Sequence, residues 1–149
     1  MLRIKDPKIS LPFYTQYFGM ELIHEMDGGD FTNYFLAFPQ PGEEGLSKEE
    51  KSARKFQREG VLELCWNHET EKEEGHPYVN GNGENGQPGR GFGHIAFTCD
   101  DVDAECARLG ALGVKFKKRP EEGKMRHIAF VYDPDMYWIE LVPSGGLKQ

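Results

Sequence analysis

No stretch of the sequence approaches the roughly 20 consecutive apolar residues that a membrane-spanning helix needs. The first residues, MLRIKDPK, have no apolar core of the signal-peptide type either. Both absences argue against a membrane protein or a secreted one. We therefore expect a soluble, cytoplasmic protein with no membrane partner.

Basic residues are outnumbered by acidic ones, and cysteines are few. There are 18 lysines and arginines against 25 aspartates and glutamates, which gives a formal net charge of -7. This balance argues against nucleic acid as the main partner, because binding to phosphates needs a basic surface. The three cysteines, Cys65, Cys99 and Cys106, form no CxxC pair. An odd number without that spacing argues against a disulfide framework and a cysteine-type zinc site, so we expect free thiols.

What the sequence does contain is an internal repeat. Apolar periodicity and helix-capping signals occur in the same order in both halves, and each half is predicted to be a βαβββ module, which places the fold in the α+β class. The first half predicts a strand at 1–5, a helix at 8–18 and strands at 20–25, 31–38 and 61–66. The second half predicts a strand at 93–98, a helix up to residue 112 and strands at 114–117, 126–132 and 137–142.

Two pairs of segments support this repeat. Asp6-Pro7 and Asp101-Val102 occupy the same helix start. The Leu-Glu-Leu stretch around Glu63 matches the Ile-Glu-Leu stretch around Glu140 in the last strand. The 149 residues suffice for one domain built from two such modules.

The predicted organisation follows from these boundaries. It comprises a first module at 1–67 with an inserted loop at 39–60, a linker loop at 68–90, and a second module at 91–149. The insertion contains SKEEKSARKFQRE, which predicts a solvated helix, and the linker contains NGNGENGQPGRG, which has no periodicity that could bury a face.

Each last strand carries one carboxylate among apolar neighbours, in VLELCW and in YWIELV. Glu63 and Glu140 either face water or lie inside, where an unpaired charge is costly. Their equivalent places in the repeat make a shared site about as favoured as the solvent-facing alternative. His94 opens the first strand of the second half. If the duplicated strands curl around one cavity, the first and last strands of each module lie close together, and His94 and Glu140 can converge with Glu63. One histidine and two carboxylates suit Zn, Ni, Co or Mn, and this donor set does not choose among them.

The sequence resembles the glyoxalase I family of the vicinal oxygen chelate superfamily over essentially its whole length. The resemblance is carried by MLRIKDPKISLPFYTQYFGM, VLELCWN, RGFGHIAF, EEGKM and DPDMYWIELV, which occur in family order. It implies a single glyoxalase domain and a homodimer whose active sites lie between subunits. Glu63, His94 and Glu140 match the family's metal-ligand positions. Zinc is the expected ion, with nickel or cobalt as alternatives.

The family's fourth protein ligand is a glutamine two residues before the methionine that matches Met1. We therefore expect either that the sequence is a truncated form or that three protein ligands are completed by water.

The resemblance also implies a glutathione site. Arg3 and Asn67 match positions that bind the γ-glutamyl end, and Arg90 matches a position nearby. Lys118 with the Gly123-Lys124-Met125 segment matches the site of the glycine carboxylate. Basic side chains suit carboxylates through charge-assisted hydrogen bonds.

The aldehyde end of the family's pocket is apolar, and Phe31, Phe35 and Met125 match it. Asn33 is polar where the family usually has an apolar residue.

The implied activity is the isomerisation of the hemithioacetal of methylglyoxal and glutathione to S-lactoylglutathione. Glu140 is the expected base, and Glu63 is the opposite carboxylate. Two alternatives stay open at this point. An iron(II)-dependent dioxygenase of the same superfamily would use two histidines and one carboxylate, which Glu63 argues against. A non-catalytic module that binds glutathione conjugates would have lost its metal.

Overall fold

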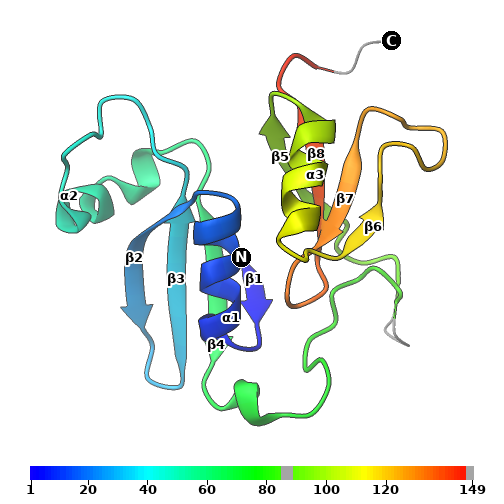
Figure 1. The fold of residues 1–149 in the computed structure, drawn as a ribbon. Coiled ribbons are helices and arrows are strands. Elements are labelled where there is room, and N and C mark those ends of the chain that lie inside the picture. The colour runs from blue at the N-terminus through cyan, green and yellow to red at the C-terminus, as the bar shows by residue number, and fades with distance from the viewer. Residues whose placement is uncertain (85–88, 147–149) are drawn as a thin grey trace. The chain divides into compact units, whose positions relative to one another are not determined.

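Two four-stranded sheets, one in each half of the chain, form the framework of the protein (Figure 1). The computed structural model describes residues 1–84 and 89–146. The chain divides into two units, Met1–Tyr78 and Val79–Gln149, and each is described by itself. Within the described ranges no helix is long and apolar enough to cross a membrane.

The first unit has the predicted order of elements. Its sheet has the order β1-β4-β3-β2, with β1 parallel to β4 and the other pairs antiparallel. The elements are β1 (Leu2–Ile4), α1 (Pro7–Pro12), η1 (Phe13–Tyr17), β2 (Glu21–Asp27), β3 (Phe31–Ala37), α2 (Lys48–Ala53), η2 (Lys55–Gln57), β4 (Leu62–Asn67) and η3 (Thr70–Lys72).

The helix predicted at 8–18 is present, but its second half is a π-helix. Asp6 caps it by accepting a hydrogen bond from the backbone N–H of Lys8 at 2.8 Å. Pro12 has no N–H to continue the α-helical ladder, and the Thr15 hydroxyl donates to the Leu11 carbonyl at 2.9 Å. These two interruptions account for the wider turns of η1. Gly19 ends the helix with a φ of 73°.

The second unit repeats the arrangement of the first. Its sheet has the order β5-β8-β7-β6, again with one parallel pair, β5 and β8. Asp101 caps α3 by accepting from the N–H of Ala104 at 2.9 Å, and Gly113, with a φ of 79°, follows the helix. The elements are β5 (His94–Cys99), α3 (Val102–Ala111), β6 (Phe116–Lys118), β7 (Ala129–Tyr132) and β8 (Trp138–Pro143).

Strand register confirms the predicted repeat. Leu64 is paired with Leu2, four residues before the Asp6 cap, and Leu141 is paired with Phe97, four residues before the Asp101 cap. Glu63 and Glu140 each precede the paired leucine by one residue. The two glutamates therefore occupy equivalent places in the two sheets.

The equivalence extends across both sheets to the outer strands. Glu63 lies opposite Phe35, and Glu140 lies opposite Phe130. Beyond each phenylalanine the register shifts by a β-bulge, between Leu22 and His24 in β2 and between Phe116 and Lys118 in β6. A bulge bends its strand and increases the local twist. Both modules therefore bend at the same point.

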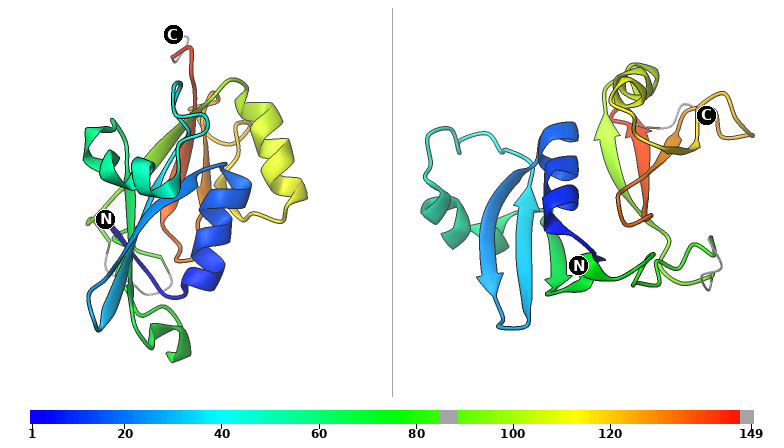
Figure 2. Two further views of the ribbon diagram at one scale, coloured as in Figure 1. Left: turned by 90° about the vertical axis from the view of Figure 1, so that its left-hand side faces the viewer. Right: turned by 60° about the horizontal axis from the view of Figure 1, so that its bottom comes forward.

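Each sheet has one face covered by a helix. Alternate side chains such as Leu36 and Leu64 in the first sheet, and Val131 and Leu141 in the second, are buried on this face. Figure 2 shows α1 beside the first sheet and α3 beside the second. Glu63 and Glu140 point to the opposite face, which we name the carboxylate face. The core thus fixes the direction of both glutamates.

The insertion at 39–60 packs against the outer strand β2. Its helical part is shorter than predicted, with α2 followed by a single 3-10 turn, η2. Ser47 and Glu50 form a capping box at the start of α2, which buries no residue. Polar contacts attach it to β2: Lys51 pairs with Glu21 at 2.5 Å, Lys48 pairs with Glu25 at 3.3 Å, and the Ser52 hydroxyl lies 2.8 Å from Nδ1 of His24.

Of the predicted linker at 68–90, residues 68–78 belong to the first unit, and polar side chains hold residues 79–84 in the second unit. The amides of Asn80 and Asn82 donate to the Met136 carbonyl at 3.2 and 2.8 Å. Glu84 forms an ion pair with Lys117 and accepts a hydrogen bond from the Tyr132 hydroxyl at 2.6 Å. Residues 85–88 of the linker, and 147–149 of the predicted second module, lie outside the described residues.

The charge state of Glu84 depends on these contacts. Partial burial opposes its ionisation, but the hydrogen bonds from Lys117 and Tyr132 outweigh it and lower the pKa of Glu84. Burial, with the adjacent Glu84 carboxylate, raises the pKa of Tyr132, so that its hydroxyl stays protonated and can donate. The anchor is therefore an ionised carboxylate held by two donors.

Replacing Tyr132 by phenylalanine should therefore destabilise the second unit. The change removes one hydrogen bond to a charged group, worth about 1.5–3 kcal/mol, and leaves the ring in place. Tyr78→Phe is a matched control, because the Tyr78 hydroxyl is buried without a partner among the described residues. Denaturant unfolding should show a loss of stability for Tyr132→Phe and none for Tyr78→Phe. Equal effects would contradict a stabilising Glu84 contact.

Candidate active site

His94 and Glu140 form a polar pair on the carboxylate face of the second sheet. Strands β5 and β8 place Nε2 of His94 3.0 Å from Oε2 of Glu140. The Phe130 ring packs edge-on against the imidazole, with the ring centroids 5.2 Å apart. The His94 side chain is 39% exposed and that of Glu140 is 16% exposed. A nitrogen donor and an oxygen donor are thus held together, with the imidazole open to solvent.

Glu63 has a different partner on the carboxylate face of the first sheet. The side-chain amide of Asn33, on the neighbouring strand β3, donates to Oε1 of Glu63 at 2.6 Å. Phe35 lies directly across from Glu63 in the sheet. The predicted opposite carboxylate is therefore hydrogen-bonded and flanked by an aromatic ring.

The predicted metal triad is divided between the two units. Glu63 belongs to the first, whereas His94 and Glu140 belong to the second. Among the described residues there is no group of three or more histidine, cysteine, aspartate or glutamate side chains that could hold a metal ion. Each unit nevertheless presents donors that fit a divalent ion of borderline hardness, an imidazole with a carboxylate in one and a carboxylate in the other.

Arg3 and Asn67, predicted to bind the γ-glutamyl end, are brought together by β1 and β4. A guanidinium nitrogen of Arg3 donates to Oδ1 of Asn67 at 3.0 Å. Cys65 lies between Asn67 and Glu63 on the same side of β4 and is paired with Arg3 on β1. Burial raises the pKa of its thiol more than Arg3 lowers it. Cys65 is therefore a neutral thiol and not a nucleophile. All three cysteines are free, as predicted.

Lys118 is brought to the predicted glycine-carboxylate segment, but its ammonium group binds the backbone there. It donates to the carbonyls of Met125 at 2.6 Å, Ile128 at 2.9 Å and Arg119 at 3.1 Å. Lys124 and Met125 are exposed. Lys118 thus orders the loop that carries Lys124, which is itself free to meet solvent or ligand.

Arg90 lies in the short segment of the linker that pairs with residues 81 and 82. Gly91 donates its N–H to the Gly81 carbonyl at 3.2 Å, and Asn82 is bridged to Gly89. Arg90 stands between the two bridged glycines, exposed and with a φ of 63°. Such a conformation is uncommon outside glycine and is compatible with a functional constraint on this residue.

Phe35, predicted for the apolar wall, contacts two rings that sequence analysis did not select. Phe35 packs against His24, with ring centroids 5.4 Å apart, and edge-on against Phe56 at 6.3 Å. Phe56 comes from the insertion and is 79% exposed. It is a large aromatic residue in an otherwise charged segment, which is the signal that could have identified it. Phe31, the other predicted wall residue, covers Gly28, where any Cβ would collide with the ring at 2.3 Å.

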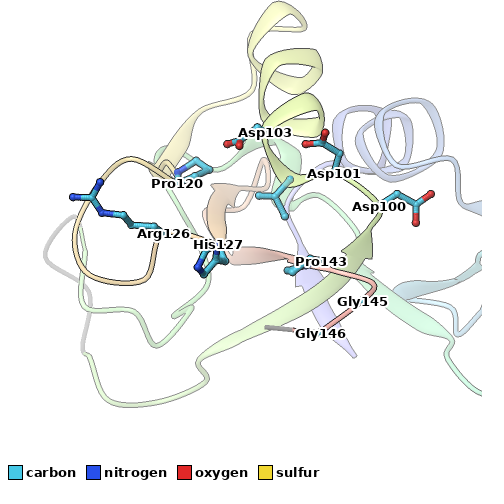
Figure 3. Close-up of a pocket in the computed structure, with 10 residues that line it drawn as sticks. Asp100, Asp101, Asp103, Pro120, Arg126, His127, Pro143, Gly145 and Gly146 are labelled. Atoms are coloured by element: carbon cyan, nitrogen blue, oxygen red, sulfur yellow. The ribbon is translucent and has the colours of Figure 1, made fainter. Parts of the chain in front are cut away.

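A cavity of about 380 Å³ in the second unit is lined by none of the predicted site residues (Figure 3). Its acidic side chains have local structural roles: Asp101 caps α3, and Asp100 accepts a hydrogen bond from the Ser144 hydroxyl at 2.9 Å. His127 and Arg126 line the other side. The cavity lacks the paired carboxylate and imidazole of the carboxylate face.

The fold and the paired glutamates agree with the family match. Residues 1–141 match the model of the Glyoxalase/Bleomycin resistance protein/Dioxygenase superfamily. The chain belongs to this superfamily.

Within it, the chain is similar to enzymes called lactoylglutathione lyase or glyoxalase I. It is 49% identical to lactoylglutathione lyase of Schizosaccharomyces pombe over 99% of this chain and 47% of that protein. It is 45% identical to glyoxalase I of Saccharomyces cerevisiae over 95% and 42%, and 44% identical to lactoylglutathione lyase of Pseudomonas aeruginosa over 97% and 80%. The chain thus spans less than half the length of the two yeast relatives.

Solved structures show the same fold. The trypanothione-dependent glyoxalase I of Leishmania major matches with a TM-score of 0.65 at 26% identity, over 97% of this chain and 84% of that one. Glyoxalase I of Zea mays matches with a TM-score of 0.66 at 28% identity, over 94% and 41%.

Proposed function

We propose that this protein is a glyoxalase I, which isomerises the hemithioacetal of methylglyoxal and glutathione to S-lactoylglutathione. The observation that carries the proposal is the equivalent placement of Glu63 and Glu140 on the carboxylate faces, with His94 beside Glu140. Similarity to lyases of this name over nearly the whole chain supports it. Three free thiols suit a reducing compartment, and we propose the cytoplasm.

Glu63, His94 and Glu140 would together hold one divalent ion, for which we propose zinc, with nickel or cobalt as alternatives. When bound, such an ion polarises the substrate oxygens as a Lewis acid and so stabilises negative charge on them. Because the triad is divided between two units, we propose a homodimer in which each site takes ligands from both subunits. Glu63 of one subunit would then act with His94 and Glu140 of its partner.

Glu140 would move the proton. Its carboxylate takes the hydrogen from the carbon that bears sulfur and hydroxyl, and the electron pair of that C–H bond moves toward the oxygen of the neighbouring carbonyl. The same proton then returns to the former carbonyl carbon, and the hydroxyl proton of the first carbon passes to the oxygen of the second. The first carbon becomes the thioester carbonyl and the second becomes the carbinol of the lactoyl group, so no oxidant or reductant is required.

The tripeptide would be held at its two charged ends. Arg3, Asn67 and Arg90 would bind the γ-glutamyl end, where guanidinium groups can form bidentate contacts with a carboxylate. At the glycine end, Lys118 would keep the 119–128 loop in place through its three carbonyl contacts, and Lys124 would meet the carboxylate directly. Phe31, Phe35, Phe56 and Met125 would line the aldehyde end.

The direct test is formation of the thioester from methylglyoxal and glutathione by the purified protein, together with its metal content. Activity that a chelator abolishes and zinc restores would support the proposal. A protein that purifies without metal yet binds S-methylglutathione would instead be a binding module. Oxygen consumption with a catechol substrate would indicate a dioxygenase.

Arg90→Ala should mainly raise the KM for the hemithioacetal, by roughly tenfold, and leave kcat nearly unchanged. Arg90 would bind a part of the substrate remote from the reacting carbon, so its loss affects substrate and transition state alike. Arg54→Ala, in the exposed insertion, is the matched control and should change neither constant. A fall in kcat with an unchanged KM would contradict this role.

A further inference from the structure

Asn33 is a buried polar residue on the carboxylate face, with only 8% of its surface exposed. It lies between Cys65 on β4 and Met26 on β2. Phe31 and Phe35 precede and follow it on the same side of β3. An amide in such surroundings is costly unless both of its polar ends are bonded.

The orientation of the Asn33 amide is fixed by Glu63. An ionised carboxylate can only accept, so the NH2 group must face it, and Nδ2 lies 2.6 Å from Oε1 of Glu63. The carbonyl Oδ1 then points elsewhere. It is buried and has no hydrogen-bond partner among the described residues. The contact with Glu63 is therefore made while the other end of the amide stays unsatisfied.

The second module shows which residue occupies the position equivalent to Asn33 when no hydrogen bond to the glutamate is made from it. Phe35 and Phe130 lie opposite the two glutamates, so the equivalent of Asn33, two residues earlier, is Ile128. Ile128 is 1% exposed and packs as an ordinary core residue. Glu140 there takes its hydrogen bond from His94 instead. An apolar residue thus fits the fold at this place, and the amide serves Glu63.

We propose that Asn33 is a positioning residue that holds the Glu63 carboxylate in its ligating orientation, at the expense of fold stability. The inference rests on the proposed function. Asn33 occupies Oε1, which leaves Oε2 of Glu63 for a cation. A carboxylate whose rotamer is already fixed loses less conformational freedom on binding, and outer contacts of this kind typically contribute 10- to 100-fold in metal affinity or activity.

The test variant is Asn33→Leu, which keeps the approximate size of the side chain and removes both polar ends. Zinc affinity, measured by competition with a chelator, should fall by roughly tenfold, and kcat should fall by a similar factor with KM unchanged. The unfolding temperature of the metal-free protein should rise, because the unsatisfied carbonyl is gone. A residue with a merely structural role would lower stability and activity together, and that result would overturn the proposal.

Thr32→Val is the matched control from the next position on the same strand. The Thr32 hydroxyl lies 2.9 Å from Nε2 of His68 and does not contact Glu63. This variant should lower the unfolding temperature and leave zinc affinity and kcat unchanged.

A double-mutant cycle with Glu63→Gln tests whether Asn33 acts through the carboxylate. In the Glu63→Gln background, Asn33→Leu should change zinc affinity by less than about twofold, because the group it positions is absent. A full tenfold loss in that background would overturn the proposal. A wild-type protein that binds zinc but shows no lyase activity would refute the proposed function only, since the cycle depends on zinc affinity alone.

Discussion

Glu140→Gln is expected to lose at least 99% of the proposed lyase activity while keeping its fold. The amide oxygen can still ligate a metal, but the amide cannot take a proton from carbon. General-base catalysis typically contributes about 10²–10⁴-fold, so the loss should appear in kcat. Initial rates at saturating hemithioacetal measure it, and zinc content with the unfolding temperature establishes that the site is otherwise intact.

Glu121→Gln is the control for this variant, because it removes one negative charge from an exposed position of the same unit. It should retain the wild-type rate. If Glu140→Gln keeps more than about a tenth of that rate, the substitution raises the activation free energy by less than roughly 1.4 kcal/mol, and Glu140 is not the base.

Mixing two inactive variants should restore activity if the sites are shared between subunits. In a heterodimer of Glu63→Gln and Glu140→Gln protomers, one site carries both substitutions and the other carries neither. After equilibration of equal amounts, half the dimers are mixed and half of their sites are intact. About a quarter of wild-type activity is therefore expected, from two samples that are each nearly inactive.

The control is the same mixture prepared at a temperature too low for subunits to exchange between dimers. The two homodimers then stay separate, and no activity should return. Sites confined to one subunit would give no recovery after exchange either. That outcome would place Glu63 and Glu140 of the same chain in one site and exclude sharing.

Most of the fold could be predicted from the sequence because the signals are local and occur twice. The Asp6 and Asp101 caps and the alternation around Glu63 and Glu140 determine the helix starts and the strand faces. The π-helical turn was not predicted, since it depends on how Pro12 and Thr15 interrupt one particular ladder. Apolar periodicity does not distinguish such turns from an ordinary α-helix.

The site was predictable only in part. Repetition of a glutamate among apolar residues indicated the paired carboxylates, and the register confirms their equivalence. The contacts of Phe56 and His24 with Phe35 were missed, because they depend on where the insertion packs against β2. The hydrogen bond from Asn33 to Glu63 joins different strands and leaves no trace in either segment alone. Contacts between distant segments require the folded chain.

The paired bulges have a consequence for solubility. Strands β2 and β6 are the outer strands of their sheets, and an outer strand presents unpaired N–H and C=O groups to which another chain could add. The bulges at Ile23 and Lys117 interrupt the regular spacing of backbone hydrogen-bonding groups, which an added strand would have to match. The increased twist also turns the edge away from such a strand. Lys117 also places a charge at one of these edges. The β-bulge that bends each sheet therefore also protects its edge strand, β2 or β6, against aggregation.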